Sequence, residues 1–364
     1  MLRRLLLACL AALPMPALAN DSVAELGTGG LVLSRSDVIA MENEDLFISP
    51  SRVTVDYVFR NMSKRDVETI VAFPMPDIEG NPYWMPAIPD ETSENFLGFS
   101  VTVDGKQRQV QVEHKAFAVD LDITEELEKH GVPLYPFGDA VYDALAKLPQ
   151  KVADDWRSRG ILVIDEYDAG EGWQRVRSPF WKLKTTYWWR MTFPAGKPVK
   201  VAHRYKPSVG ATAGLTFFYD GAFGGETYGD YKAKYCMDKA FENAIVKAAR
   251  QNPDGYPPLF ENRISYILTT GGNWASGTIG KFKLTIDKGD TRNLVSFCGE
   301  NVKKVGPTTF EMTADDYYPA KNIEILLLAN FDWNAETSSR AADLGAPPAR
   351  QKLPFPNAPE EAVE

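Results

Sequence analysis

The sequence predicts a mainly β protein with two β-sandwich-like domains, a helical insertion in the first domain and a helix in the connector. Several segments alternate apolar and polar residues, as strands with one buried face do. Between residues 122 and 160 the apolar period changes to that of helices. The chain has 364 residues, and one hydrophobic core rarely extends beyond roughly 250–300 residues. Two domains are therefore expected.

The N-terminal segment "MLRRLLLACLAALPMPALA" has the three parts of a secretory signal peptide. Two arginines precede an apolar stretch, and Ala17-Leu18-Ala19 forms an A-x-A cleavage motif. We expect a signal peptide over residues 1–19, cleavage after Ala19 and a periplasmic mature protein. No later apolar run reaches the ~20 residues that a spanning helix needs, so we expect no transmembrane segment in the mature chain.

The mature chain is expected to be acidic. Removing Arg3 and Arg4 with the signal peptide takes the formal charge from −9 to −11. Nucleic-acid binding needs a basic face that releases counterions from phosphates. The charge therefore argues against a nucleic-acid partner.

The first domain is predicted over residues 20–210. Residues 53–60 and 67–73 alternate in phase and are predicted to form a hairpin. A second hairpin is expected around Asp104-Gly105, residues that tolerate a positive φ. Two further strands, over 181–193 and 199–205, are joined by "PAGK", which is predicted to be a hairpin turn.

A helical insertion is predicted at about 122–160 within this domain. "DITEELEKHG" begins with capping-box-like spacing and ends at Gly131. "GDAVYDALAKLPQKVADDWRSRG" is typical of two helices divided at Pro149 and ended at Gly160. The pattern thus indicates helices inserted between strands.

The second half of the chain is predicted to have three parts. A Gly- and aromatic-rich loop followed by a helix forms a connector over 211–262, and a C-terminal β domain covers 263–332. Residues 333–364 are rich in Pro, Ala and Glu and bury too little apolar area to order themselves, so they are predicted to be a disordered tail.

Two cysteines, Cys236 and Cys298, remain after the predicted cleavage. In an oxidising compartment an isolated pair is most simply a disulfide. Two inert thiols, or a reactive thiol acting with a histidine, are the alternatives. A bridge would stabilise the fold by about 4 kcal/mol through the loop it closes.

Local catalytic and cofactor motifs are absent from the sequence. It has no G-x-S-x-G, Walker, H-E-x-x-H, C-x-x-C or G-x-G-x-x-G motif, and its acidic loops lack EF-hand spacing. We expect no cofactor, no metal site and no locally encoded catalytic residue. His203 shares a strand face with Val199 and Tyr205, which favours a core histidine over a ligand.

The strand "WKLKTTYWWRMTF" suggests a weak ligand-binding face. Its alternation places Trp188 among cations on the outward face, where an indole could stack on a sugar or help to hold an anion. In the alternative, the helical insertion covers this face and buries Trp188. The candidate binding residues are Trp188, Lys182, Lys184, Arg190 and Tyr228.

Two resemblances refine these expectations. "NDSVAELGTGGLVLSRSDVIAMENEDLFISP", "GTIGKFKLTIDKG" and "LVSFCGENVKKVGPTTFEM" closely resemble the bacterial exported family called domain of unknown function 4424. That family implies an envelope location and no catalytic residues. "FRNMSKRDVETIVAFPMPD" and "TFPAGKPVKVAHRYKPSVG" are similar to the vault protein inter-alpha-trypsin domain, which implies a β-sandwich without its metal-dependent partner domain.

Three functions remain open from the sequence. The leading hypothesis is a non-enzymatic periplasmic binding or assembly factor of the cell envelope, with an envelope protein, glycan or lipid as partner. A hydrolase of an envelope polymer is the first alternative, and a structural subunit of an envelope complex is the second. The hydrolase would gather its groups from Asp165, Glu166, Asp168, Asp220, Glu226 and His203.

Overall fold

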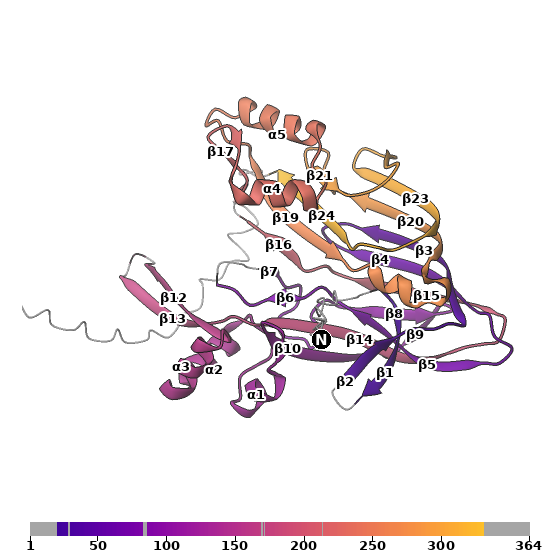
Figure 1. Cartoon of the computed structure of the whole chain (residues 1–364). Helices are drawn as coiled ribbons and strands as arrows, with labels where there is room; N and C mark the ends of the chain where they lie inside the picture. The colour runs from indigo at the N-terminus through magenta and orange to yellow at the C-terminus, as the bar shows by residue number, and fades with distance from the viewer. Residues whose placement is uncertain are drawn as a thin grey trace, which may run out of the picture.

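The computed structural model describes residues 20–330, except 28–29, 83–85, 169, 171 and 213. The predicted signal peptide and the predicted disordered tail lie outside the described residues. The prediction of a mainly β fold is confirmed (Figure 1). Within the described part of the chain, no helix is both long and apolar enough to cross a bilayer.

An eight-stranded sheet, here called the long sheet, runs through the middle of the molecule (Figure 1). In spatial order its strands are β22 (Lys303–Lys304), β23 (Thr309–Tyr317), β20 (Ile279–Asp287), β3 (Ile39–Ile48), β4 (Val53–Asn61), β15 (Pro198–Tyr205), β8 (Ser100–Val103) and β9 (Lys106–Arg108). Strands β3 and β20 pair in parallel, with Met41 opposite Ile279. Segments from both halves of the chain thus build one sheet.

Two smaller sheets accompany the long sheet, in addition to two separate two-stranded hairpins. The seven-stranded sheet follows the path β11 (Leu121–Asp122), β10 (Gln111–Ala118), β14 (Lys182–Phe193), β5 (Val67–Pro74), β1 (Ser22–Gly27), β2 (Gly30–Ser34), and β6 (Ile78–Glu79) also pairs with β14. The five-stranded sheet is β21 (Leu294–Phe297), β24 (Ile323–Asn330), β19 (Leu259–Tyr266), β16 (Val209–Ala211), β7 (Pro86–Ala87).

Both smaller sheets pack on the same face of the long sheet. Cross-strand partners share a face, and the register links Leu284, Leu46, Val55, His203 and Val101 in one row across five strands. Every member of this row is buried. Inward residues of both smaller sheets belong to the same apolar cluster, among them Phe73, Trp189, Ile264 and Ile325. The two sandwich-like halves therefore share one sheet, which crosses the predicted domain boundary, and the boundaries themselves stay a prediction.

Two predicted hairpins are wrong, because their turns carry the chain from one sheet to the other. β4 lies in the long sheet and the following β5 in the seven-stranded sheet. "PAGK" likewise connects β14 to β15 across the sandwich. An alternating pattern shows which face of a strand is buried but not which strand lies beside it. The predicted hairpin at Asp104-Gly105 is confirmed as β8–β9, with φ values of 48° and 76° at the turn.

The helical insertion is present. It contains α1 (Thr124–Lys129), α2 (Asp139–Lys147) and α3 (Gln150–Ser158), with Pro149 between the last two. These helices bury their apolar faces against Ala116, Ala118 and Trp181 of the seven-stranded layer. A hairpin of β12 (Leu162–Asp168) and β13 (Trp173–Pro179) follows, so Asp165, Glu166 and Asp168 lie on a strand rather than in the expected loop.

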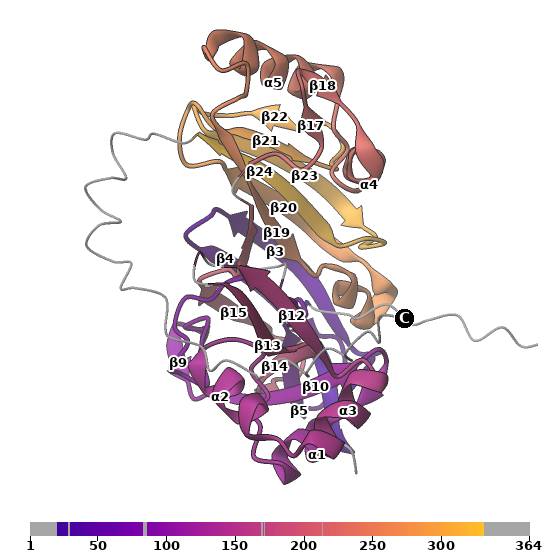
Figure 2. The same cartoon turned by 90° about the vertical axis from the view of Figure 1, so that its left-hand side faces the viewer.

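Two helices cover the outer face of the five-stranded sheet, at the end of the molecule opposite the helical insertion (Figure 2). The expected helix is α5 (Lys239–Gln251), whose N-cap Asp238 accepts a hydrogen bond from the Phe241 amide. The helix α4 (Gly225–Lys234) occupies a stretch predicted as a Gly-rich loop. The remaining short elements are β17 (Phe218–Tyr219), β18 (Ala222–Phe223), η1 (Thr269–Asn273) and η2 (Ala275–Gly277).

Candidate functional site

A cleft of about 320 Å³ lies where the two smaller sheets meet above the long sheet. One wall comes from the segment Met75–Glu79, which follows β5 and includes β6 of the seven-stranded sheet. The other wall comes from α4 and β19, and Tyr205 of the long sheet also lines the cavity. Its volume is at the lower end of the range for small-molecule sites. We call it the inter-sheet cleft.

The first wall carries two carboxyl groups, and one of them, Glu79, forms an ion pair with Lys182 at 3.6 Å. Asp77 and Glu79 line it. Pro74 and Pro76 have no amide N–H to donate to a ladder, and β5 ends at Pro74 before the chain pairs with β14 again at β6. Burial raises the pKa of Asp77, and the nearby charges of Lys184 and Lys182 oppose that rise. Asp77 is therefore a half-buried carboxyl at the edge of a cavity.

The opposite wall carries two cations, each of them paired with an acid. The guanidinium of Arg263 lies in an ion pair with buried Glu261 at 3.2 Å and donates a 2.6 Å hydrogen bond to the Tyr231 hydroxyl. Glu261 also accepts hydrogen bonds from Thr216, so its charge is well satisfied. Lys234 stands exposed at the rim, 3.4 Å from Glu324. The cleft thus places two carboxyl groups opposite two cations, and Glu79, Arg263 and Lys234 each also have an oppositely charged partner on their own side.

Tyrosine hydroxyls add neutral polar groups to the cleft. Burial raises the pKa values of Tyr205, Tyr231 and Tyr235, so all three stay protonated at neutral pH. A protonated phenol can donate or accept a hydrogen bond. The lining therefore suits a ligand with both donors and acceptors.

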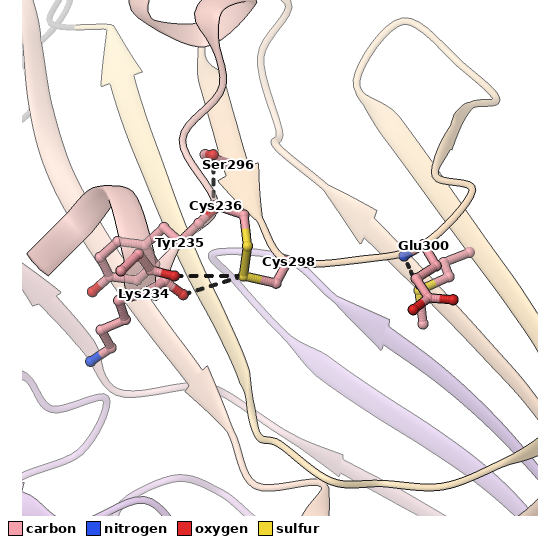
Figure 3. The surroundings of a disulfide bond; sticks show 8 residues. Lys234, Tyr235, Cys236, Ser296, Cys298 and Glu300 are labelled. Atoms are coloured by element: carbon pink, nitrogen blue, oxygen red, sulfur yellow. Dashed lines mark hydrogen bonds between the residues drawn. A yellow bond between two sulfur atoms is a disulfide. The ribbon is translucent and has the colours of Figure 1, made fainter. Parts of the chain in front are cut away.

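The predicted disulfide is present and holds the base of α4. Cys236 follows the helix directly and is bonded to Cys298 beyond β21, with Cα atoms 5.0 Å apart (Figure 3). Next to the bridge, the Ser296 hydroxyl donates a 3.0 Å hydrogen bond to the Tyr235 carbonyl. The cleft residues Lys234 and Tyr235 are therefore fixed to the five-stranded sheet.

The predicted Trp188 face is divided by the fold. Trp188 is half-buried beneath the β1–β2 hairpin, where it packs on Ala24, Ile70 and Ala72, so its cover is not the helical insertion. Lys182 and Lys184 lie at the cleft end of β14, close to Asp77. Arg190 is exposed six residues further along, roughly 20 Å away at strand rise.

Tyr228 does not join this face. It lies on α4, far from β14 in both views, and its hydroxyl donates a hydrogen bond to Glu242 (Figures 1 and 2). The proposed ligand role of the five residues stays a prediction.

The carboxylates named for a hydrolase are not gathered either. Glu166 pairs with Arg175 at 2.7 Å on the β12–β13 hairpin, and Asp168 accepts amide hydrogen bonds from Gly170 and Gly172. Glu226 lies on α4 and Asp220 lies in the turn between β17 and β18, and both views show these elements far from the β12–β13 hairpin (Figures 1 and 2). His203 is sealed in the core, and burial lowers its pKa to about 3.

Among the residues that the structure describes, no group of three or more His, Cys, Asp or Glu side chains is arranged to hold a metal ion. The cleft residues Asp77, Arg263, Tyr231 and Lys234 were not singled out by the sequence. Two signals pointed near them: the proline pair at 74 and 76, and the position of Cys236 just after the aromatic stretch.

The comparison with protein families matches the model described as "Domain of unknown function (DUF4424)" over residues 19–326. The chain belongs to this family. The match runs through the strands of all three sheets and through both walls of the inter-sheet cleft. The fold described above is therefore that of a DUF4424 member. No curated protein matches the chain.

Three solved structures resemble this DUF4424 chain distantly. A crystal structure from Legionella pneumophila, described as a "putative nutrient binding protein", has 16% identity and a TM-score of 0.37, over 81% of this chain and 68% of that one. A two-domain M1 zinc metallopeptidase mutant bound to L-tryptophan has 7% identity and a TM-score of 0.20, over 81% and 44%. Latent PorU from Porphyromonas gingivalis has 11% identity and a TM-score of 0.13, over 86% and 21%. Similarity at this level carries no functional argument.

Proposed function

We propose that the protein is an exported, non-enzymatic binding protein of the cell envelope that holds a small zwitterionic ligand in the inter-sheet cleft. The observation that carries the proposal is the placement of two carboxyl groups, Asp77 and Glu79, opposite two cations, Arg263 and Lys234, across a cavity of about 320 Å³. A free amino acid or a short peptide has the matching chemistry.

Export is part of this proposal. The signal-peptide pattern and its A-x-A motif support it, and so does the disulfide, since such bonds persist in oxidising compartments. Cleavage after Ala19 then releases a mature chain that begins at Asn20.

The charges are placed to select a ligand with two opposite ends. An ammonium group would meet the Asp77 wall, and a carboxylate would meet Arg263 and Lys234. A charge-assisted hydrogen bond contributes about 1.5–3 kcal/mol, which corresponds to roughly a 10- to 100-fold change in Kd. A ligand lacking either charge should bind more weakly by that factor.

The test is calorimetric titration of the mature protein with free amino acids and di- and tripeptides, together with their N-acetylated and C-amidated forms. Binding of a free zwitterion, weakened about tenfold or more by either cap, supports the proposal. The variants Asp77→Asn and Lys234→Met should each weaken binding. Asp56→Asn and Lys247→Met are matched controls on exposed residues outside the cleft lining.

A protein that bound none of these compounds, or bound capped and free forms equally, would contradict the zwitterion assignment. The assembly role would then be examined by crosslinking in envelope extracts. Capture of one defined envelope protein through the cleft wall, lost in Lys234→Cys modified with a bulky maleimide, would identify the site as a protein-docking surface instead.

A further inference from the structure

A buried polar cluster lies in the core where the first residues after the predicted cleavage site meet three strands of the long sheet and one strand of the five-stranded sheet. Its members are Asn20, Asp21, Glu44, Tyr57, His203 and Tyr266, all of them buried. The Asn20 side-chain amide donates a 2.9 Å hydrogen bond to Glu44 Oε2, and the Tyr266 hydroxyl donates to Glu44 Oε1 at 3.2 Å. Asn20 Oδ1 accepts a hydrogen bond from the Tyr57 hydroxyl.

The start of β1 is tied to the C-terminal half as well. The indole of Trp274 donates a 2.6 Å hydrogen bond to the Asp21 carbonyl, and Asn273 donates to the Ser22 hydroxyl at 3.0 Å. Residues 20–22 are thus anchored from several sides at full burial. The conformation of this segment is set by the core rather than by solvent.

The cluster has two acids and lacks a cation. Asp21 and Glu44 are completely buried, and no lysine or arginine of the described residues forms an ion pair with either. The nearest base is His203, with Nε2 3.5 Å from Asp21 Oδ2, but desolvation lowers its pKa and keeps the ring neutral. Neither carboxylate oxygen of Asp21 has a hydrogen-bond partner within the described chain.

An unpaired buried carboxylate is costly, and an ammonium group that pairs with it and donates hydrogen bonds offsets part of that cost. Cleavage after Ala19 would convert the Asn20 amide nitrogen into an α-ammonium group with three donors. Four bonds of about 1.5 Å separate this nitrogen from the side-chain nitrogen of the same residue. Since that side-chain nitrogen contacts Glu44, the new charge would arise within the cluster.

We propose that the α-ammonium group released at Asn20 is buried as the counter-charge of Asp21 and Glu44, so that removal of the leader completes the folded core. This inference rests on the cleavage included in the proposed export and is independent of any ligand in the inter-sheet cleft. Before cleavage the nitrogen is a neutral amide, and the two acids must stay protonated for the core to close.

The pH response follows from the groups that face the cluster. Desolvation raises the pKa of Glu44 from 4.5 to about 8 and also raises that of Asp21. An acid with a raised pKa binds more protons in the folded state, so its stabilising effect is present at low pH and is lost as pH rises from 4.5 through 8. The other titratable groups facing the cluster are Tyr57, His203, Tyr205, Tyr266 and Tyr317. They are the same before and after cleavage.

The first test compares two forms of the oxidised protein, one starting at Asn20 and one with Gly-Ala added before Asn20. A third form, with Gly-Ala added after Glu364, controls for the extra residues. At pH 7.5 the form with the N-terminal extension should have a lower urea midpoint than the form that starts at Asn20. At pH 5 the difference between the two midpoints should be smaller. Equal midpoints for all three forms across this range would overturn the proposal.

The second test introduces Glu44→Gln into both N-terminal forms. With the α-ammonium present the substitution removes its counter-charge and should lower the midpoint at pH 7.5. In the extended form it removes an unpaired buried acid, so the loss should vanish or reverse. The same loss in both forms would contradict the ion pair, because a purely structural role of Glu44 does not depend on the chain start.

The third test uses the wild-type protein exported from cells and needs no variant. Mass measurement of the N-terminal peptide checks that the chain begins at Asn20, and another start would overturn the proposal. In brief labelling with an amine-reactive ester, the buried α-amine should react far more slowly than exposed Lys247 in the native protein, and comparably in urea. If the α-amine and Lys247 reacted at the same rate in the native protein, the α-amine would be exposed to solvent and the proposal would be overturned. That outcome would not affect ligand binding in the inter-sheet cleft.

Discussion

The side-chain amide of Asn61 donates a 2.7 Å hydrogen bond to the backbone carbonyl of Phe193 and a second, 2.9 Å bond to that of Arg65. Asn61 ends β4, Phe193 ends β14, and the two strands belong to facing sheets. The Gly196 amide in turn donates to the Asn61 carbonyl. A single buried side chain thus links the β4–β5 connection to the β14–β15 connection, the two connections that were predicted to be hairpin turns.

Replacement of Asn61 by Ala should destabilise the protein by about 1–3 kcal/mol, because two carbonyl groups at the corner lose their donor. Asn61→Asp should also destabilise, since a carboxylate cannot donate and its charge would be buried. Met62→Ala is the matched control at the adjacent exposed position. Urea denaturation at neutral pH measures the three values, and an Asn61→Ala midpoint like that of Met62→Ala would be inconsistent with this role.

Reduction of Cys236–Cys298 should cost about 4 kcal/mol of stability for its 62-residue separation. The Cys236→Ser, Cys298→Ser double variant should unfold at correspondingly lower urea concentration, with or without reductant. The wild type should match it only when reductant is present. Two alkylatable thiols in the native, unreduced protein would show that the bridge does not form.

Arg177→Met should loosen the end of α2 from the β12–β13 hairpin, because Arg177 lies on β13. The buried guanidinium donates hydrogen bonds to the carbonyls of Leu145 and Leu148 at 3.0 and 2.7 Å, where α2 ends. Leaving those carbonyls unsatisfied should cost about 2–3 kcal/mol. Hydrogen exchange should speed up in α2 and α3 but not in α5. Arg157→Met, at an exposed position of α3, is the control and should leave exchange unchanged.

His203 should make the fold less stable in acid. Desolvation lowers its pKa from 6.5 to about 3, so the folded state binds fewer protons than the unfolded state between these values. Its contribution is fully present above pH 6.5 and is lost as pH falls toward 3, by up to about 1.4 kcal/mol per pH unit. His203→Phe, which suits the aromatic neighbours Phe73 and Phe99, should flatten the profile.

His130 provides the control for that profile. It is exposed at the end of α1, so His130→Asn should leave the slope of the wild type intact. Unfolding free energies measured by urea titration at several pH values between 4 and 7 supply the comparison. An unchanged slope in His203→Phe would assign the acid sensitivity to other groups.

Local patterns in the sequence located most strands and helices, but not their neighbours. The alternation at 53–60 and 67–73 correctly identified which side chains are buried, because burial of one face is a local property. Which strand lies beside another depends on the path of the connection between them. The connection over residues 61–66 is long enough either to close a hairpin or to cross from one sheet of a sandwich to the other. The parallel pairing of β3 with β20 leaves no local trace, since it joins residues far apart in the chain.

The cleft was harder to foresee than the fold. Gly225 and Gly229 lower the helix propensity of α4, which is held by packing on the five-stranded sheet rather than by its own residues. Arg263 lies in an ordinary alternating strand, where nothing marks it as different from a surface arginine. In the sequence, only Pro74 and Pro76 indicate that regular β-structure ends just before Asp77.

The parallel contact between β3 and β20 has a mechanical consequence. Many binding proteins enclose a ligand by rotating two lobes about a hinge. Here the two smaller sheets that flank the inter-sheet cleft both pack on one continuous sheet, the long sheet. A hinge rotation of one half against the other would break the backbone hydrogen bonds between β3 and β20. The cleft is therefore preformed. Any movement on ligand binding should be confined to α4 and the Met75–Glu79 segment. The backbones of the free and ligand-bound protein should superimpose closely everywhere else.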